Sequence, residues 1–138
     1  MGDLERFRDA HRRDFAQAYA EIQNGYKETH WMWYIFPQIQ GLGRSSTAQY
    51  YAVSDIEEAV EFLSDPYLGD NLRAITKELL SKSTNDAEDI FGYIDAMKLK
   101  SSMTLFALTS EDYTIFDEVL EHFFGGEMDE VTVKLING

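Results

Sequence analysis

Signals that start helices recur along the chain, and they constrain its fold more than any other feature. Ser54, followed three residues later by Glu57, has the pattern of a capping box. Asp65 supplies a cap and Pro66 a first-turn proline for the next segment. Because such signals precede segments whose apolar residues recur at helical spacing, the sequence predicts an all-α fold.

The spacing of these signals predicts about seven short helices. We expect them at residues 4–22, 47–53, 54–63, 65–82, 95–108, 112–124 and 129–136, with a single turn at 89–92 that a glycine ends. No alternating apolar run is long enough to indicate a sheet. A chain of 138 residues without a linker or internal repeat forms one core, so residues 1–138 are predicted to be a single compact domain.

The run from Trp31 to Phe36 is apolar at every position, and Pro37 closes it. Periodicity does not decide between helix and strand in so short a run. Since continuous apolarity requires cover on both faces, we expect the run at the centre of the core. The predicted core comprises Trp31, Trp33, Phe36, Phe91, Met103 and Phe106. The alternative is that Trp31 or Trp33 stacks on a base or sugar.

The chain carries a formal net charge of −13, from 25 acidic and 12 basic side chains. The whole excess lies in residues 51–138, where no lysine or arginine occurs between Lys100 and Lys134. This charge opposes nonspecific binding to nucleic acid or anionic lipid, so neither is an expected partner. It indicates a solvated acidic face or, alternatively, a docking surface for a basic protein.

The chain contains no cysteine, which excludes disulfides, thiolate metal sites and a cysteine nucleophile. His11 and His122 lack partners at metal-ligand spacing, so no metal site is expected. The first twenty residues are charged, and no stretch approaches the roughly 18 apolar residues of a membrane span. These features predict a soluble, cytoplasmic protein.

Several motifs occur together and in a fixed order. They are the string from His30 to Gln38, then Gly41 to Ser45, Ile90-Phe91-Gly92, Asp95, Lys98-Leu99 and Ser101 to Phe106. In this combination the chain resembles the bacterial domain-of-unknown-function family 1810 over essentially its full length. The resemblance implies a small all-α fold and no established activity. Members sometimes carry the label calpastatin, but calpastatin's inhibitory repeats are disordered polar segments, unlike this aromatic-rich chain.

Two segments contain side chains suited to binding an anion. His30 borders the aromatic run, where an imidazole could shuttle a proton or orient a phosphate; the alternative is that it only bonds to backbone groups. The glycines of 41–46 precede a helix start, and Arg44 and Ser45 lie there, as anion binding requires in outline. An ordinary capped turn explains the same loop.

A third segment is the helix expected at 95–108. Asp95, Lys98 and Ser102 fall on one face of it, so a lysine beside hydroxyl groups could grip a phosphate or activate a serine. An ion pair between Asp95 and Lys98 within the helix is the structural alternative.

These residues lead to two hypotheses from different classes. The first is a small-molecule binding domain for an anionic or phosphorylated metabolite, whose predicted site comprises His30, Arg44, Ser45, Lys98 and Ser102. The second is a noncatalytic protein-interaction domain whose acidic face includes Glu118, Glu121, Glu127 and Glu130. Spacing alone identifies no pair of nucleophile and base, so catalysis and any cofactor are left open.

Overall fold

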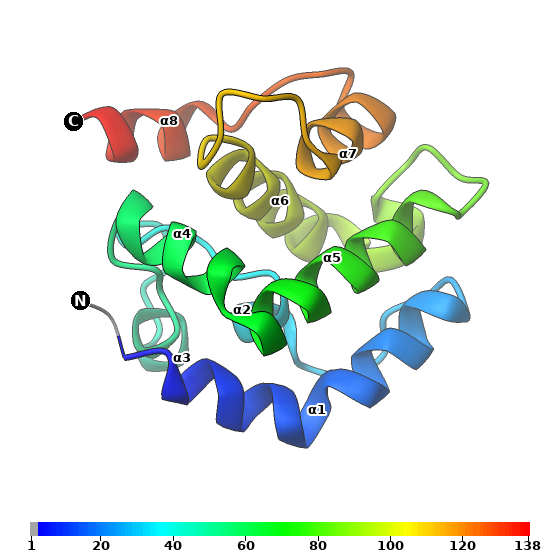
Figure 1. The fold of residues 1–138 in the computed structure, drawn as a ribbon. Helices are drawn as coiled ribbons and strands as arrows, with labels where there is room; N and C mark the ends of the chain where they lie inside the picture. Colours follow the sequence, from blue (N-terminus) through cyan, green and yellow to red (C-terminus); the bar gives the residue numbers. More distant parts are fainter. Residues whose placement is uncertain (1–2) are drawn as a thin grey trace.

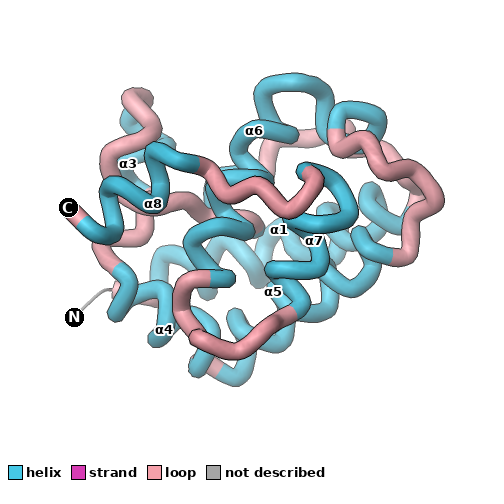
Figure 2. Tube along the Cα trace, turned by 90° about the horizontal axis from the view of Figure 1, so that it is seen from above, coloured by secondary structure: helices cyan, strands magenta, loops and turns pink. Residues whose placement is uncertain are grey.

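The computed structural model describes residues 3–138, which form eight α-helices and no strand (Figures 1 and 2). The helices are α1 (Glu5–Gln23), α2 (Met32–Ile35), α3 (Ser46–Tyr50), α4 (Ile56–Ser64), α5 (Pro66–Leu80), α6 (Glu88–Ala107), α7 (Ile115–Phe124) and α8 (Glu130–Asn137). The all-α prediction is confirmed. The additional helix is α2, because the aromatic run that periodicity left undecided folds into one helical turn.

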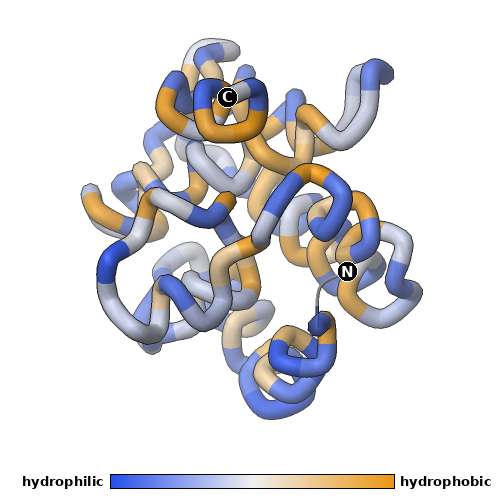
Figure 3. Tube along the Cα trace, turned by 90° about the vertical axis from the view of Figure 1, so that its left-hand side faces the viewer, coloured by the Kyte–Doolittle hydropathy of each residue, from blue (hydrophilic) through white to orange (hydrophobic). Residues whose placement is uncertain are grey.

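The helices pack around α5 and α6, which cross the middle of the molecule in Figure 1. α1 packs along α5, which also contacts α4 and α7. α6 packs most extensively on α7 and also contacts α4 and α8. Figure 3 shows α1 and α8 nearly end-on, with hydrophilic residues covering most of the outer side of α1. The helices therefore enclose one apolar core, as expected of amphipathic elements.

The predicted caps at Asp65 and Asp129 are confirmed, whereas the helix start predicted at residue 112 is wrong. The Asp65 side chain accepts the Leu68 N–H at 2.9 Å, with Pro66 in the first turn of α5. The Asp129 side chain caps α8 in the same way. The helix expected to start at residue 112 is α7, which begins at Ile115. Its cap is Thr114, which forms a full capping box with the Asp117 side chain. The capping box of Thr114 and Asp117 therefore determines where this helix begins.

The capping box predicted from Ser54 and Glu57 is also wrong, by one residue. Asp55 is the cap of α4, and its carboxylate accepts the Glu58 N–H at 2.8 Å. The Glu58 side chain reaches back to the Ser54 N–H at 2.9 Å. The sequence offers two overlapping capping patterns, and the carboxylate of Asp55 is the one used.

Gly92 divides α6 into two parts, as the predicted turn at 89–92 requires. Its backbone has φ 77° and ψ 170°, a conformation that side-chain-bearing residues rarely adopt. The turn before Gly92 buries Ile90 and Phe91, whereas Tyr93 and Ile94 after it are exposed. The break therefore redirects the chain before the long part of α6 that carries Lys98.

The aromatic part of the predicted core is confirmed with one exception. Trp31, Phe36 and Phe91 form a mutually contacting group with ring centroids 6.0 to 6.4 Å apart, and Met103 and Phe106 are fully buried. Trp33 packs against the core but is half-buried, so it lies at the edge of the core and not among its fully buried residues. Successive side chains of a helical turn point about 100° apart, so the four residues of α2 cannot all face inward.

Candidate functional site

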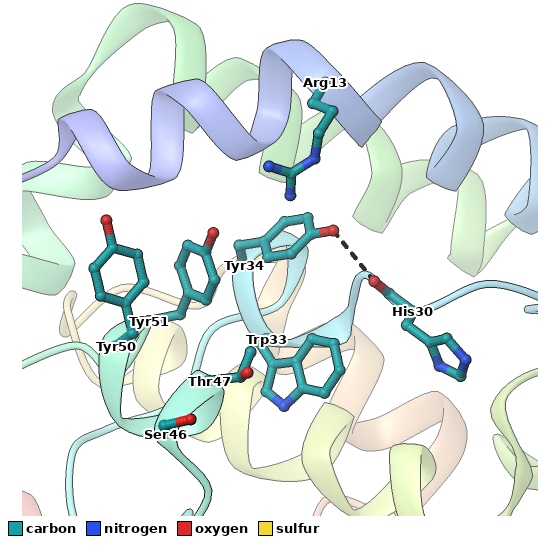
Figure 4. Close-up of a pocket in the computed structure, with 8 residues that line it drawn as sticks. All are labelled: Arg13, His30, Trp33, Tyr34, Ser46, Thr47, Tyr50 and Tyr51. Atoms are coloured by element: carbon teal, nitrogen blue, oxygen red, sulfur yellow. Dashed lines mark hydrogen bonds between the residues drawn. The ribbon is translucent and has the colours of Figure 1, made fainter.

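The ring of Trp33 lies in an open groove of about 570 Å³, which we call the Trp33 groove. The groove lies between α1, α3 and the segment that contains α2 (Figure 4). Its lining residues are Arg13, His30, Trp33, Tyr34, Ser46, Thr47, Tyr50 and Tyr51. Its volume is within the range of small-molecule sites, about 300–1,000 Å³, and its lining combines aromatic rings with a few polar groups.

The buried Glu21 carboxylate fixes the segment that leads into the groove. It accepts the backbone N–H groups of Glu28 at 2.7 Å and Thr29 at 3.0 Å, and the indole N–H of Trp31 at 2.9 Å. Burial raises the pKa of this carboxyl, but hydrogen bonds from Thr29, Gln17 and Glu28 outweigh burial and lower the pKa to about 2. Glu21 is therefore ionised at neutral pH and holds the chain immediately before His30.

His11 anchors α2 to α1 from inside the core. Its Nε2 lies 2.9 Å from the Tyr34 carbonyl oxygen, and its Nδ1 lies 3.1 Å from the amide nitrogen of Asn71. Burial lowers the pKa of His11 to about 4, so the ring is neutral at pH 7. A neutral ring with these neighbours donates from Nε2 and accepts at Nδ1. The backbone of Tyr34 is thereby held against α1.

Arg13 and Tyr34 form the α1 side of the groove (Figure 4). The Tyr34 hydroxyl donates to Asp14 and lies 3.2 Å from the His30 carbonyl oxygen, and burial followed by Asp14 raises the pKa of Tyr34 to about 12. The Arg13 guanidinium lies 5.4 Å from the Tyr34 ring centroid. Its Nε donates to Asp14 at 3.0 Å. Hydrogen bonding, chiefly with Tyr34, raises the pKa of Arg13, so the groove has a permanent cation.

Each of the two tryptophans has a lysine over its ring. The Lys98 Nζ lies 5.4 Å from the Trp33 ring centroid, and the Lys27 Nζ lies 5.1 Å from that of Trp31. Asp95 bridges them, with its carboxylate 2.9 Å from Lys27 and 3.6 Å from Lys98. The ion pair that the sequence offered for Asp95 and Lys98 is therefore present. Lys98 also lines a second, mostly apolar cavity of about 360 Å³.

A family model described as "Protein of unknown function (DUF1810)" matches residues 1–136. The chain belongs to the DUF1810 family. The crystal structure of the conserved hypothetical protein Rv1873 from Mycobacterium tuberculosis is similar to this DUF1810 chain at 38% identity. The match has a TM-score of 0.95 and covers 99% of this chain and 97% of Rv1873. The comparison with curated proteins gave no match.

The family assignment confirms the resemblance that the motifs indicated. It brings no ligand or reaction to this DUF1810 chain. No helix within residues 3–138 is both long and apolar enough to span a membrane. No group of three or more metal-ligating side chains was found in that part of the chain. The polar groups that line the Trp33 groove therefore define its chemistry.

Of the predicted site residues, the structure brings His30 and Lys98 close to Trp33. His30 is exposed and lines the Trp33 groove, where its ring extends away from Tyr34 (Figure 4). Lys98 covers the Trp33 ring rather than lining the same groove. His30 therefore borders the Trp33 groove, whereas Lys98 is connected to it only through its contact with Trp33.

Arg44 and Ser45 lie outside both cavities of this DUF1810 domain. The Ser45 hydroxyl accepts the Ala48 N–H at 3.1 Å, which makes it the cap of α3. The side chain of Arg44 is exposed, and its carbonyl oxygen accepts the Gln49 amide at 3.0 Å. These bonds fit the capped turn that was the structural alternative for this loop. The anion-binding role of Arg44 and Ser45 stays a prediction.

Ser102 is placed in the core, with 0% exposure. Its hydroxyl has no hydrogen-bond partner among residues 3–138. The neighbouring Ser101 lines the cavity beside Lys98 instead. Side chains on one face of a helix can lie at the surface or in the interior. The helical spacing that placed Ser102 and Lys98 on one face therefore did not specify which of the two a ligand can reach.

Sequence reasoning missed the residues that form most of the groove, namely Arg13, Tyr34, Tyr50 and Tyr51. Arg13 is one of several arginines on α1, and nothing in its spacing distinguishes it. The adjacent pair Tyr50-Tyr51 was the available signal, because two tyrosines next to a loop can offer an aromatic surface to a ligand. That signal becomes informative only when α3 is seen to face Trp33 (Figure 4).

The acidic residues of the alternative hypothesis divide between two places. Glu118 and Glu121 line a cavity with Tyr113, whereas Glu127 and Glu130 line another cavity, where Lys100 pairs with Glu127 at 3.1 Å. All four glutamates are exposed. The structure thus gives this DUF1810 domain two acidic hollows, and docking of a basic protein stays a prediction.

Proposed function

We propose that this DUF1810 domain binds a small anionic or phosphorylated metabolite in the Trp33 groove. One observation carries the proposal. No acidic side chain is among the residues that line the groove, although the protein has 25 acidic side chains and a net charge of −13. A concave site with a cation on its wall concentrates small anions, even within a protein that repels anionic polymers.

The groove offers suitable partners for an anionic group. Arg13 supplies a permanent cation whose Nε is engaged by Asp14, and no hydrogen bond from its terminal nitrogens to a carboxylate occurs within residues 3–138. Ser46 and Thr47 contribute hydroxyls from α3, and His30 lies at the edge of the groove. A planar guanidinium suits bidentate recognition of phosphate or carboxylate.

The test is a thermal-shift screen against sugar phosphates, nucleotides and carboxylate metabolites. A ligand that binds only the folded state raises the melting temperature, by an amount that grows with its concentration. The Arg13→Gln variant should lose this shift. The matched control is Arg12→Gln, because Arg12 is the adjacent exposed arginine on α1, pairs with Asp9 and lies outside the groove lining. Equal shifts in the two variants would contradict the proposed site.

We propose further that the domain works in the cytosol and does not take nucleic-acid polymers. The absence of cysteine and the charge of −13 support these statements. Fractionation of cells that express the chain should recover it in the cytosolic fraction. Electrophoretic mobility of labelled single- and double-stranded oligonucleotides should be unchanged by the protein at low salt, and a retarded band would overturn the second statement.

A further inference from the structure

Trp33 occupies an unusual position for so large an apolar side chain. Every other residue from Trp31 to Phe36 is buried, and Trp33 alone is left half-buried, with its ring on the wall of the groove. Large aromatic rings at a concave surface are found where a ligand covers them. The half-buried ring of Trp33 therefore leaves part of its surface available to a ligand in the groove.

The Trp33 ring is carried on a segment that is held from several directions. His11 bonds to the carbonyl oxygen of Tyr34, the residue next to Trp33, at 2.9 Å. Glu21 holds the chain before α2 through the Trp31 indole at 2.9 Å. The Lys98 ammonium lies 5.4 Å from the Trp33 ring centroid. A ring fixed in this way loses little conformational freedom when a ligand stacks on it.

The opposite side of the groove is aromatic as well. Tyr50 is 60% exposed, and its ring centroid lies 4.8 Å from that of Tyr51, which in turn lies 4.9 Å from that of Tyr34. Figure 4 shows these rings on one side of Trp33, with Arg13 above Tyr34. Ring surfaces thus dominate the groove and the permanent cation lies at its α1 side, an arrangement that suits a flat ring joined to an anionic group.

We infer that the metabolite is a mononucleotide, whose base stacks on Trp33 and whose phosphate is bound by Arg13. This inference rests on the proposed function and narrows its ligand class. The groove volume of about 570 Å³ is that of a site for one small molecule. A sugar phosphate without a base would leave the indole and tyrosine surfaces of the groove uncovered, whereas a nucleoside without a phosphate would leave Arg13 with Asp14 as its anionic partner.

The first experiment is isothermal titration calorimetry of the full chain with five probes: AMP, UMP, adenosine, ribose 5-phosphate and inorganic phosphate. Stacking of a base on an aromatic side chain is worth about 5- to 150-fold in affinity. We therefore expect AMP to bind at least about fivefold more tightly than ribose 5-phosphate. UMP should lie between them because a pyrimidine offers a smaller stacking surface. Adenosine should bind more weakly than AMP.

The second experiment separates the two ends of the ligand by substitution. Trp33→Leu should weaken AMP at least about tenfold and change ribose 5-phosphate binding less than about threefold, whereas Trp33→Phe should retain most AMP affinity. Arg13→Gln should weaken the binding of AMP and of ribose 5-phosphate but not the binding of adenosine. Tyr113→Leu is the matched control, since Tyr113 is 63% exposed and lines a different cavity. Circular dichroism and melting temperature verify that each variant folds.

The outcomes separate failure of the inference from failure of the proposed function. If ribose 5-phosphate binds as tightly as AMP, or if AMP binding survives Trp33→Leu, the ligand is anionic but not a mononucleotide. If adenosine binds as tightly as AMP, the phosphate contact with Arg13 is wrong. If none of the five probes binds, the inference is overturned, and the wider metabolite screen alone then decides the proposed function.

Discussion

The two tryptophans of the chain lie two residues apart and face opposite surroundings. Trp31 is 1% exposed and donates its indole N–H to the buried Glu21 carboxylate, whereas Trp33 is half-buried and lines an open groove. Both rings have a lysine over them, Lys27 over Trp31 and Lys98 over Trp33. The contrast teaches that one helical turn serves the core with its inner face and a surface site with its outer face. The predictions below test that division.

The largest effect is expected on the inner face. Trp31→Ala should reduce the free energy of unfolding by about 3–5 kcal/mol, because it removes a fully buried ring from contact with Phe36 and Phe91. It also leaves the Glu21 carboxylate without its indole donor. Urea denaturation followed by circular dichroism measures the loss. A loss under about 1 kcal/mol would place Trp31 outside the core.

Acid should destabilise the anchor between α1 and α2. His11 has a folded-state pKa of about 4, below its ordinary value of 6.5, so the unfolded state binds its proton first as the pH falls. The stability that His11 contributes is complete above pH 6.5 and is lost as the pH falls through 4, a total of about 3 kcal/mol. Denaturant unfolding between pH 7 and pH 4.5 should show this slope. His11→Gln should flatten it, and an unchanged slope in that variant would assign the effect to other groups.

On the outer face, Trp33→Ala should cost only about 1 kcal/mol, since a half-buried ring contributes less apolar burial than Trp31. When Trp33→Ala and Trp31→Ala are measured in the same denaturant, the ratio of their losses in unfolding free energy compares the two faces directly. Equal losses would show that Trp33 belongs to the core and that the groove has no free ring surface.

The smallest effect is expected at Arg44. Arg44→Ala should change the free energy of unfolding by less than about 0.5 kcal/mol, because the side chain is exposed and its structural bond is made by the backbone. It should also leave AMP affinity unchanged, in contrast to Arg13→Gln. A loss of AMP binding in Arg44→Ala would restore the loop at 41–46 as part of the site, and calorimetry with the two variants decides between them.

Local patterns were enough to predict most of the fold, because caps and stops act between neighbouring residues. Asp65 and Asp129 start helices in the structure as their sequence contexts predict, and Gly125 ends α7 in the left-handed conformation. The failures at 54 and 112 occur where two capping patterns overlap within a few residues. The fold class depends on many such signals together, so single errors of register did not change it.

The candidate site depended on contacts that the sequence does not display. Trp33 lines the groove because of how α2 is turned, and Arg13 reaches the groove because α1 passes beside Tyr34. Ser102 shares a helical face with Lys98 and is nevertheless fully buried. His30 was identified because it borders the aromatic run, which the structure places at the groove. Residues adjacent to a distinctive segment could be predicted, and residues brought there by packing could not.

The central claim is that Trp33, and not Trp31, faces the ligand, and nuclear magnetic resonance tests it most directly. The chain has two tryptophans, so a ¹⁵N-labelled sample gives two indole N–H signals, which Trp33→Phe assigns by removing one. On titration with AMP, the Trp33 signal should move progressively and saturate, while the Trp31 signal, bonded to Glu21, should stay nearly fixed. Saturable AMP binding that leaves the Trp33 signal unmoved, or that moves only the Trp31 signal, would contradict the account.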